Sequence, residues 1–196
     1  MKSIHGFNYP PFVRGIKAGK IAVIPTDTLL GVVGLALNKK TIQKIYVLRG
    51  RNRKKPMIVL ISSLNDLKHF GIKLNLFQKR LIKKVWPDKV SIIFPCKSKN
   101  LKYLHRGTRT IAFRLPLKKS LRILIRKTGP LVAPSANPQG KPVAGNINEA
   151  WDYFGDSIDF YVKGKIKKSL PSTIISLKNN FIKIIRPGAV DVSNYL

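Results

Sequence analysis

The hydrophobic pattern of the first fifty residues has one abrupt break. An uninterrupted apolar run, Ile-Ala-Val-Ile at 21–24, is followed directly by Pro-Thr-Asp-Thr at 25–28. A short apolar run indicates a buried strand, whereas proline, hydroxyl and carboxylate side chains favour a turn. A second such break lies at 131–140, where Leu-Val-Ala gives way to Pro-Ser-Ala-Asn-Pro-Gln-Gly. Both places predict a core strand that delivers polar groups to an edge of a sheet.

Apolar residues also recur at helical spacing, with lysine and arginine on the opposite face, and this predicts amphipathic helices. A short helix that Ser62 or Ser63 caps is expected to run to Phe70. Other predicted helices are 11–20, 41–48 with Thr41 as its N-cap, 74–86, 120–127 and 149–154.

Further apolar runs of strand length predict the rest of the sheet. The run 57–61 is apolar throughout, which indicates a strand covered on both faces. The other predicted strands are 90–94, 110–115, 131–133, an edge strand at 160–162, and a hairpin of 171–177 with 181–186 around the turn 178–181. Helices and strands partly alternate at the front and form a hairpin at the back, so we expect an α/β fold with a mixed sheet.

Length and composition fit one globular domain over residues 1–196, because 44% of the residues are hydrophobic and only 23% are charged. No stretch resembles a signal peptide or reaches the roughly 18 apolar residues of a membrane span. The single cysteine, Cys96, lies in an apolar phrase and is expected to be a buried small residue rather than a nucleophile. These features predict a cytoplasmic protein with no membrane partner.

Charge is the unusual property of the chain. Lys and Arg total 38 against 8 Asp and Glu, a formal net charge of +30. Such a field attracts polyanions such as tRNA or ATP, yet a lysine excess spread along the whole chain fits compositional drift equally well. The local cluster Arg-Gly-Arg-Asn-Arg-Lys-Lys at 49–55 is more specific. Because it follows a predicted helix C-terminus, an anion there would be held by side chains and not by the helix dipole.

Several familiar kinds of site are excluded by their missing motifs. The chain has no phosphate-binding loop, no Gly-x-Gly-x-x-Gly and no Gly-x-Ser-x-Gly, and a single glutamate argues against a paired-carboxylate hydrolase. His5, His69 and His105 are isolated and do not have zinc spacing. The polar residues that remain at predicted strand ends are Thr26, Asp27, Thr28, Arg49, Arg51, Lys55, Thr110, Arg114, Ser135, Asn137, Ser172, Thr173 and Arg186.

This set fits a phosphate-bearing ligand, because arginine suits bidentate phosphate and carboxylate contacts and hydroxyls can donate to the remaining oxygens. It contains no evident nucleophile, so the protein would position two substrates and stabilise charge. Each member also has a plainer interpretation: the threonines and Ser135 could satisfy turn backbone, and the 49–55 cluster could be a solvated loop. Asp27 is expected to form an Asx-type turn bond and is not a candidate catalytic residue.

The same residues carry a family resemblance. The motifs, in order, are Pro-Thr-Asp-Thr at 25–28, Arg-Gly-Arg at 49–51 with Lys-Pro at 55–56, Trp-Pro at 86–87, Ala-Phe-Arg at 112–114, Ala-Pro-Ser-Ala-Asn at 133–137, Pro-Ser-Thr at 171–173 and Arg-Pro-Gly at 186–188. Together they resemble the YrdC-like family of threonylcarbamoyl-AMP synthases, in its short single-domain form. The match runs from about residue 21 to 188.

The resemblance implies a twisted α/β sheet with a basic concave face and a nucleotidyltransferase reaction. In this reaction ATP, L-threonine and bicarbonate give threonylcarbamoyl-AMP and pyrophosphate, the first step of N6-threonylcarbamoyladenosine formation in tRNA. Magnesium would come with ATP, no metal ligand is assigned, and proteins that transfer the product to tRNA would be partners. The implied threonine contacts are Thr28, Arg114, Ala133 and Ser172. The implied ATP contacts are Arg51, Lys55, Thr110, Ser135 and Arg186, and the implied catalytic set is Arg49, Arg51, Ser135 and Asn137.

Four departures from the family pattern accompany the resemblance. Arg49 stands where the family commonly has lysine, Leu30 replaces an aromatic residue, and Leu60 stands where many relatives have a histidine. Trp-Pro-Asp-Lys-Val-Ser at 86–91 replaces the commoner Trp-Pro-Gly-Pro-x-Thr. The alternative function is a non-catalytic module that binds double-stranded RNA, tRNA or rRNA, which the net charge favours. Against it, RNA-binding domains usually expose aromatic side chains, and the aromatics here occupy core-like positions.

Overall fold

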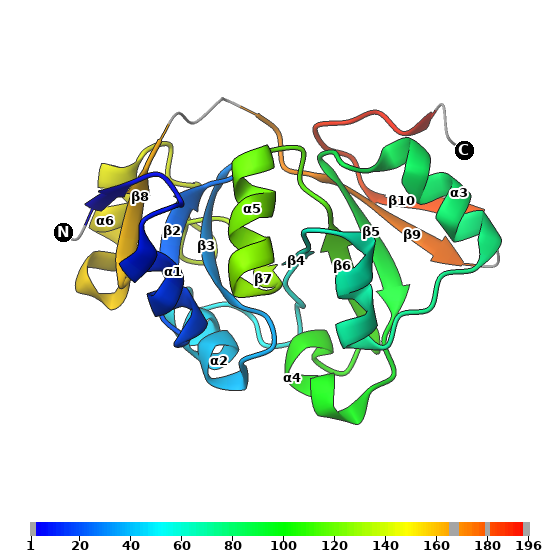
Figure 1. Ribbon diagram of the computed structural model, residues 1–196, viewed down its shortest axis with the longest axis horizontal. Coiled ribbons are helices and arrows are strands. Elements are labelled where there is room, and N and C mark those ends of the chain that lie inside the picture. Colours follow the sequence, from blue (N-terminus) through cyan, green and yellow to red (C-terminus); the bar gives the residue numbers. More distant parts are fainter. Residues whose placement is uncertain (1–2, 165–168, 179–180, 194–196) are drawn as a thin grey trace.

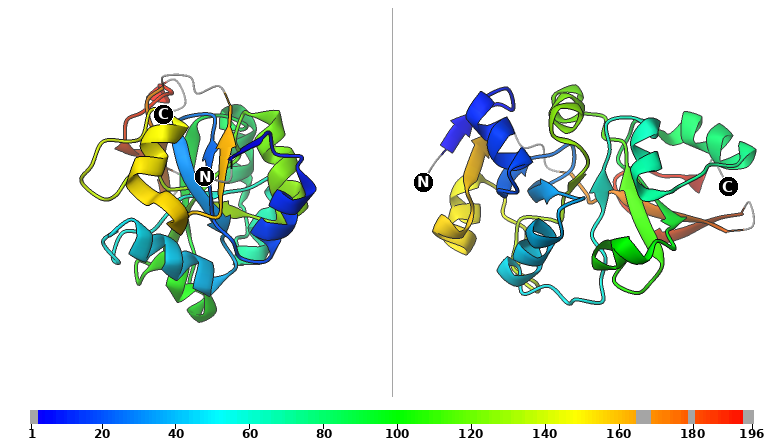
Figure 2. Two further views of the ribbon diagram at one scale, coloured as in Figure 1. Left: turned by 90° about the vertical axis from the view of Figure 1, so that its left-hand side faces the viewer. Right: turned by 60° about the horizontal axis from the view of Figure 1, so that its bottom comes forward.

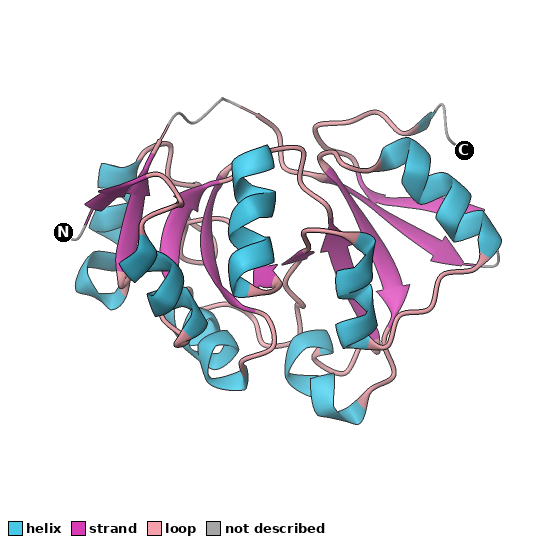
Figure 3. Ribbon diagram, viewed as in Figure 1, coloured by secondary structure: helices cyan, strands magenta, loops and turns pink. Residues whose placement is uncertain are grey.

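Ten strands join in one twisted mixed sheet with helices packed on it (Figures 1 and 3). The computed structural model describes residues 3–164, 169–178 and 181–193. The strands are β1 (Ser3–His5), β2 (Ala22–Pro25), β3 (Leu30–Leu35), β4 (Val59–Leu60), β5 (Val90–Pro95), β6 (Thr110–Arg114), β7 (Leu131–Val132), β8 (Phe160–Lys163), β9 (Thr173–Lys178) and β10 (Phe181–Arg186). Their order is β1-β8-β2-β3-β7-β4-β6-β5-β9-β10, with both parallel and antiparallel pairs.

The α-helices are α1 (Pro10–Lys17), α2 (Lys39–Leu48), α3 (Leu76–Val85), α4 (Lys102–His105), α5 (Lys119–Thr128) and α6 (Ile147–Phe154). Short 3-10 helices cover η1 (Leu64–Phe70), η2 (Lys99–Leu101) and η3 (Gly155–Ser157). Helices α1 and α5 lie over the first half of the sheet, and α2 and α4 lie next to one another at its lower edge in Figure 1. The mixed α/β class predicted from the sequence is confirmed.

Two apolar clusters hold the helices to the sheet, and residues 21–24, in and directly before strand β2, contribute side chains to both. Ala22 and Ile24 belong to the cluster that α1 and α5 cover, whereas Ile21 and Val23 belong to the larger cluster that includes α2, α3 and α6. Side chains alternate across a strand, so an uninterrupted apolar run is required where both faces are covered. This explains why the run ends only at the point where β2 leaves the sheet.

Most helix predictions are confirmed, with shifts at the ends. Helix α1 ends before Gly19, whose φ of +87° suits glycine alone. Ser63 caps η1 in a capping box with Asp66, although that segment is a 3-10 helix. Thr41 is not the N-cap of α2: Asn38 is, and its side chain accepts the Thr41 N–H at 3.1 Å. The Thr41 hydroxyl donates to the Gly19 carbonyl instead.

The strand predictions fail where pairing depends on distant segments. The segment at 160–162 is not an edge strand, because β8 lies between β1 and β2. Strand β1 occupies that edge, and its three residues carry no recognisable pattern. The run 57–61 gives only a two-residue strand, β4, which is fully buried. The β9–β10 hairpin is confirmed, and its predicted turn falls partly outside the described residues.

Cys96 is buried, as predicted for a small core residue, and its thiol lies 3.6 Å from the Phe70 carbonyl. Within the described ranges, no helix has the length and apolar character needed to cross a membrane.

Candidate active site

A cavity of about 230 Å³ opens where the loops after β2, α2 and β7 meet the segment before β9. Arg114, at the end of β6, and Arg186, at the end of β10, complete its wall. Seven of the eleven site residues implied by the family resemblance line it, and so does Thr26: the seven are Thr28, Arg51, Arg114, Ala133, Ser135, Ser172 and Arg186. The strand ends therefore gather these side chains into one crevice, as expected for an α/β sheet.

The wall of this cavity is positively charged. Arg51, Arg114 and Arg186 contribute three guanidinium groups, and no carboxylate belongs to the described lining. Apolar surface comes from Leu30 and Pro56, and from residues that were not predicted to form the site, namely Met57, Ile58, Val143 and Ile174. The cavity thus offers fixed donors in a partly apolar setting, where electrostatic interactions are stronger than in bulk water.

Arg114 is the most deeply buried charge in the cavity wall, with a side chain only 4% exposed. Its Nη2 lies 3.2 Å from Oδ1 of Asp27, which is itself 5% exposed, and its Nη1 donates to the Thr28 hydroxyl at 3.1 Å. Burial lowers the pKa of Arg114, and the Asp27 carboxylate opposes this shift. The pair fixes both the guanidinium and the neighbouring hydroxyl.

The role predicted for Asp27 is therefore wrong. It does not close a local turn, since Oδ1 faces Arg114 and Oδ2 accepts the N–H of Leu117 at 3.0 Å. The turn bonds come from Thr26, whose hydroxyl donates to the Leu29 carbonyl and accepts the Thr28 N–H. Asp27 instead ties the β2–β3 loop to the end of β6 through a buried ion pair.

Ser172 joins the two C-terminal motifs. Its carbonyl accepts a 2.6 Å hydrogen bond from Nη2 of Arg186, and its hydroxyl lies 2.9 Å from that of Ser91, which is fully buried. The Ala189 N–H donates to the Pro171 carbonyl at 2.8 Å. The Pro-Ser-Thr and Arg-Pro-Gly motifs are thus packed backbone against backbone.

We predict that Gly188→Ala destabilises this junction. A Cβ at residue 188 would lie 2.6 Å from both the Ser172 carbonyl carbon and the Thr173 nitrogen, and backbone atoms cannot yield as a flexible side chain can. Overpacking of this kind costs about 1–3 kcal/mol. Urea unfolding measures the loss, and Gly145→Ala is the matched control, because a Cβ there meets only the Glu149 side chain at 3.5 Å or more. Equal stability of the two variants would contradict the prediction.

Arg49 and Asn137 lie behind the cavity and do not line it. Arg49 is 3% exposed, and it donates from Nε to the Asn137 carbonyl and from Nη2 to the Asn137 Oδ1 and the Ser135 hydroxyl. The Ser135 hydroxyl donates to the same Oδ1 at 2.7 Å. Burial, and secondarily the charge of Arg51, lower the pKa of Arg49 to about 10, which leaves it protonated at neutral pH. These two residues hold Ser135 in the cavity wall.

The two remaining site predictions fall outside the cavity lining. Lys55 is exposed, and its carbonyl accepts hydrogen bonds from the Tyr46 hydroxyl and from Nε of Arg51. Thr110 begins β6, at the end opposite Arg114, and its hydroxyl donates to that of Thr108 at 3.1 Å. The structure therefore places the backbone of Lys55, but not its ammonium group, in the framework that orients Arg51.

No group of three or more His, Cys, Asp or Glu side chains suitable for a metal ion occurs in the described ranges. His105 is a structural residue: its Nδ1 accepts the Gly107 N–H, so its Nε2 carries the proton and donates to the Ser98 carbonyl. The chemistry of the cavity is that of arginine, hydroxyl and backbone groups.

Comparison with known proteins connects this arrangement to a family. The Sua5/YciO/YrdC family model, described as "Telomere recombination", matches residues 14–188, nearly the whole chain. The chain belongs to this family. A threonylcarbamoyl-AMP synthase of Bacillus subtilis is 30% identical over 178 residues, which cover 89% of this chain and 51% of that protein. A putative threonylcarbamoyl-AMP synthase of Methanocaldococcus jannaschii is 30% identical and covers 91% of this chain and 84% of its own length.

Solved structures of family members share the fold. Sua5 of P. abyssi complexed with L-threonine superimposes with a TM-score of 0.87 at 25% identity, covering 99% of this chain and 59% of that one. YciO of E. coli gives a TM-score of 0.85 at 21% identity and covers 98% of its chain. This chain therefore spans about half the length of the Bacillus and Pyrococcus family members and almost all of YciO.

Proposed function

We propose that the protein is an L-threonylcarbamoyladenylate synthase that uses ATP, L-threonine and bicarbonate. The observation that carries this proposal is the convergence of three arginines and four hydroxyl side chains in one cavity that has no lining carboxylate in the described chain. Such a wall is complementary to the phosphates of a nucleotide and to the carboxylate of an amino acid. Family membership and the synthase names of its relatives support the same activity.

Threonine is assigned to the part of the cavity around Arg114. The Nε–H of Arg114 is buried and has no acceptor among the described residues, so the carboxylate of a bound amino acid would complete its hydrogen bonding. The hydroxyls of Thr28 and Ser172 and the backbone of Ala133 lie in the same lining, where they would contact the rest of the ligand. A Sua5 relative from Pyrococcus has been solved in complex with L-threonine, which supports threonine as a substrate.

The nucleotide is assigned to the part formed by Arg51, Ser135 and Arg186. Arg51 is oriented by hydrogen bonds from Nε to the Lys55 carbonyl and from Nη2 to the Pro56 carbonyl. Contacts from Lys55 and Thr110 to ATP remain predictions from the family resemblance. Because none of the described lining residues offers a carboxylate to a cation, magnesium would arrive as part of the Mg–ATP substrate.

In the proposed reaction the threonine amine forms a bond to the carbon of bicarbonate and water leaves, giving a carbamate. A carbamate oxygen then attacks the α-phosphorus of ATP, and the bond to pyrophosphate breaks. Neither step of this reaction uses a nucleophile from the protein. The protein holds the carbamate and the phosphate in line and stabilises charge on the phosphate oxygens through fixed guanidinium and hydroxyl donors.

The proposal predicts that pyrophosphate release requires all three substrates. Purified protein is incubated with Mg–ATP, L-threonine and bicarbonate, and threonylcarbamoyl-AMP is detected by mass spectrometry alongside pyrophosphate. Omission of threonine, or removal of carbon dioxide and bicarbonate, is expected to abolish both signals. Pyrophosphate release without threonine, or no adduct with all substrates present, would overturn the proposed function.

A further inference from the structure

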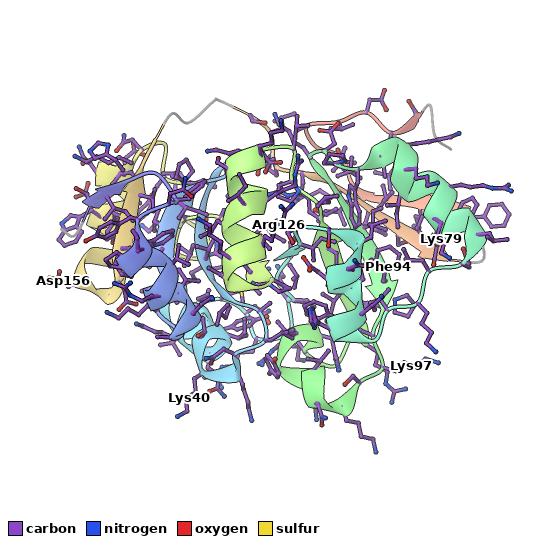
Figure 4. All side chains as sticks on the ribbon, in the orientation of Figure 1. Lys40, Lys79, Phe94, Lys97, Arg126 and Asp156 are labelled. Atoms are coloured by element: carbon purple, nitrogen blue, oxygen red, sulfur yellow. The ribbon has the colours of Figure 1, made fainter. Side chains whose placement is uncertain are left out.

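Ser91 is a fully buried polar residue of β5 that does not line the candidate active site. Side chains alternate along a strand, and Val90, Ile92 and Phe94, which Figure 4 labels, all belong to the larger apolar cluster. Ser91 therefore points to the opposite face of β5. On that side β5 pairs with β9, and Ser91 is in register with Ile174, which lines the cavity. Figure 2 (right) shows β5 beside the β9–β10 hairpin. Ser91 thus lies directly behind the cavity wall.

The hydroxyl of Ser91 meets that of Ser172, with 2.9 Å between the two oxygens. No other described residue forms a hydrogen bond with the Ser91 hydroxyl. The Ser172 oxygen also accepts a hydrogen bond from Nη2 of Arg186 at 3.3 Å, because a guanidinium can only donate. A hydroxyl has one proton and two lone pairs, so these contacts restrict the direction of the bond between the two serines.

One direction leaves a buried donor unpaired, and the other does not. If Ser172 donated to Ser91, the Ser91 proton would be buried with no acceptor among the described residues, at the full desolvation cost of that group. If Ser91 donates, its proton is satisfied, and the Ser172 oxygen accepts from both Ser91 and Arg186. The Ser172 proton is then left for the cavity, which Ser172 lines. The second direction is therefore favoured.

The backbone of Ser172 is held in place without the Ser91 hydroxyl. The N–H of the next residue, Thr173, donates to the Lys89 carbonyl at 3.0 Å. The Ser172 carbonyl accepts from Nη2 of Arg186 at 2.6 Å. Loss of the Ser91 hydroxyl would therefore release the direction of the Ser172 O–H and leave the surrounding segment where it is.

We infer that Ser91 is a positioning residue, which donates to Ser172 and thereby makes the Ser172 hydroxyl a donor to an anionic oxygen of the ligand. The guanidinium groups of Arg114 and Arg186 line the same cavity. With the Ser172 oxygen already accepting twice, none of these three groups can accept a hydrogen bond from the amine of an amino acid. The amine of bound threonine would then face away from Ser172. The identification of the ligand as threonine rests on the proposed function.

Neutron diffraction from crystals of the unliganded protein in D₂O tests the direction of the bond. Deuterium on Ser91 Oγ is expected to lie on the line to Ser172 Oγ. Deuterium of Ser172 on that line, pointing to Ser91, would overturn the inference. The measurement requires no turnover, so it decides the direction whether or not the protein forms threonylcarbamoyl-AMP.

Variants test the consequence for the substrate. Ser91→Ala is expected to lower kcat/KM for threonine about fivefold, a part of the roughly 10- to 100-fold loss expected when Ser172→Ala removes a hydrogen bond to a charged group. Because Ser91 acts through the Ser172 hydroxyl, Ser91→Ala is expected to cause no further loss beyond about 1.5-fold in the Ser172→Ala background. Ser91→Thr keeps the hydroxyl and is expected to stay within about twofold of the unmodified chain.

Ser176→Ala is the matched control, because it removes a hydroxyl from the neighbouring strand β9 at a residue outside the cavity lining. Its kcat/KM is expected within about twofold of the unmodified chain. An unchanged kcat/KM in Ser91→Ala, or a loss that persists in the Ser172→Ala background, would overturn the inference. Thermal unfolding of each variant separates lost stability from lost direction. Adduct formation by the unmodified chain is measured first, and its absence would contradict the proposed function alone.

Discussion

Replacing Asp27 by asparagine is expected to lower the free energy of unfolding by about 3–5 kcal/mol. The substitution keeps the size of the side chain, and the amide oxygen can still accept the N–H of Leu117. It leaves Arg114 positively charged, 4% exposed and without its carboxylate. For a chain of this size, such a loss corresponds to a fall in melting temperature of about 6–20 °C.

Thermal and urea unfolding measure this loss, and Asp152→Asn provides the matched control. Asp152 lies on α6 and is exposed, so the same chemical change there is expected to alter stability by no more than about 0.5 kcal/mol. A loss for Asp27→Asn as small as that of the control would mean that Arg114 does not need its partner. We also expect a higher KM for threonine, because Arg114 and Thr28 share one hydrogen-bonded unit.

The strand ends were the part of the site that could be predicted from the sequence. An apolar run that stops at hydroxyl, amide or arginine residues marks both a buried strand and the polar group it delivers, and this logic finds Thr28, Arg114 and Ser135. It also yields the mixed sheet, because runs of four to six apolar residues are too short for independent helices. Local sequence patterns are enough to predict a strand and the polar residue at its end, because both depend on the same short segment.

The predictions that failed depend on segments far apart in the chain. Asp27 follows proline and threonine, a pattern typical of a turn, yet its partner Arg114 stands at the end of another strand. Strand β8 looks like an edge until β1, a strand of three residues, pairs with it. For Arg49 a solvated loop was the plainer interpretation of the sequence, yet its guanidinium is buried against Asn137 and Ser135. The hydrophobic periodicity of the sequence contains no signal for these pairings between distant segments.

The basic loop also shows that neighbouring arginines of one charge run can lie in different environments. Its arginines alternate in direction: Arg49 is buried under Ser135, Arg51 lines the candidate active site, and Arg53 lines a second cavity, which lies between α2 and α4. Gly50, with a φ of +56°, permits the change of direction between the first two. Total charge therefore predicts little about any single arginine, and burial and hydrogen bonding decide its role.

Arg51→Ala is expected to lower kcat for adduct formation about a hundredfold, as removal of one charge-stabilising donor typically does. Arg53→Ala is the control, because it removes the same charge from the same loop at a residue that lines the other cavity. We expect its kcat within about twofold of the unmodified chain. Equal losses of kcat in both variants would mean that turnover responds to the total charge of the loop. An unchanged kcat in Arg51→Ala would show that Arg51 does not act in the site. A selective loss would place the Arg51 guanidinium, which the Lys55 and Pro56 carbonyls orient, at the reacting phosphate.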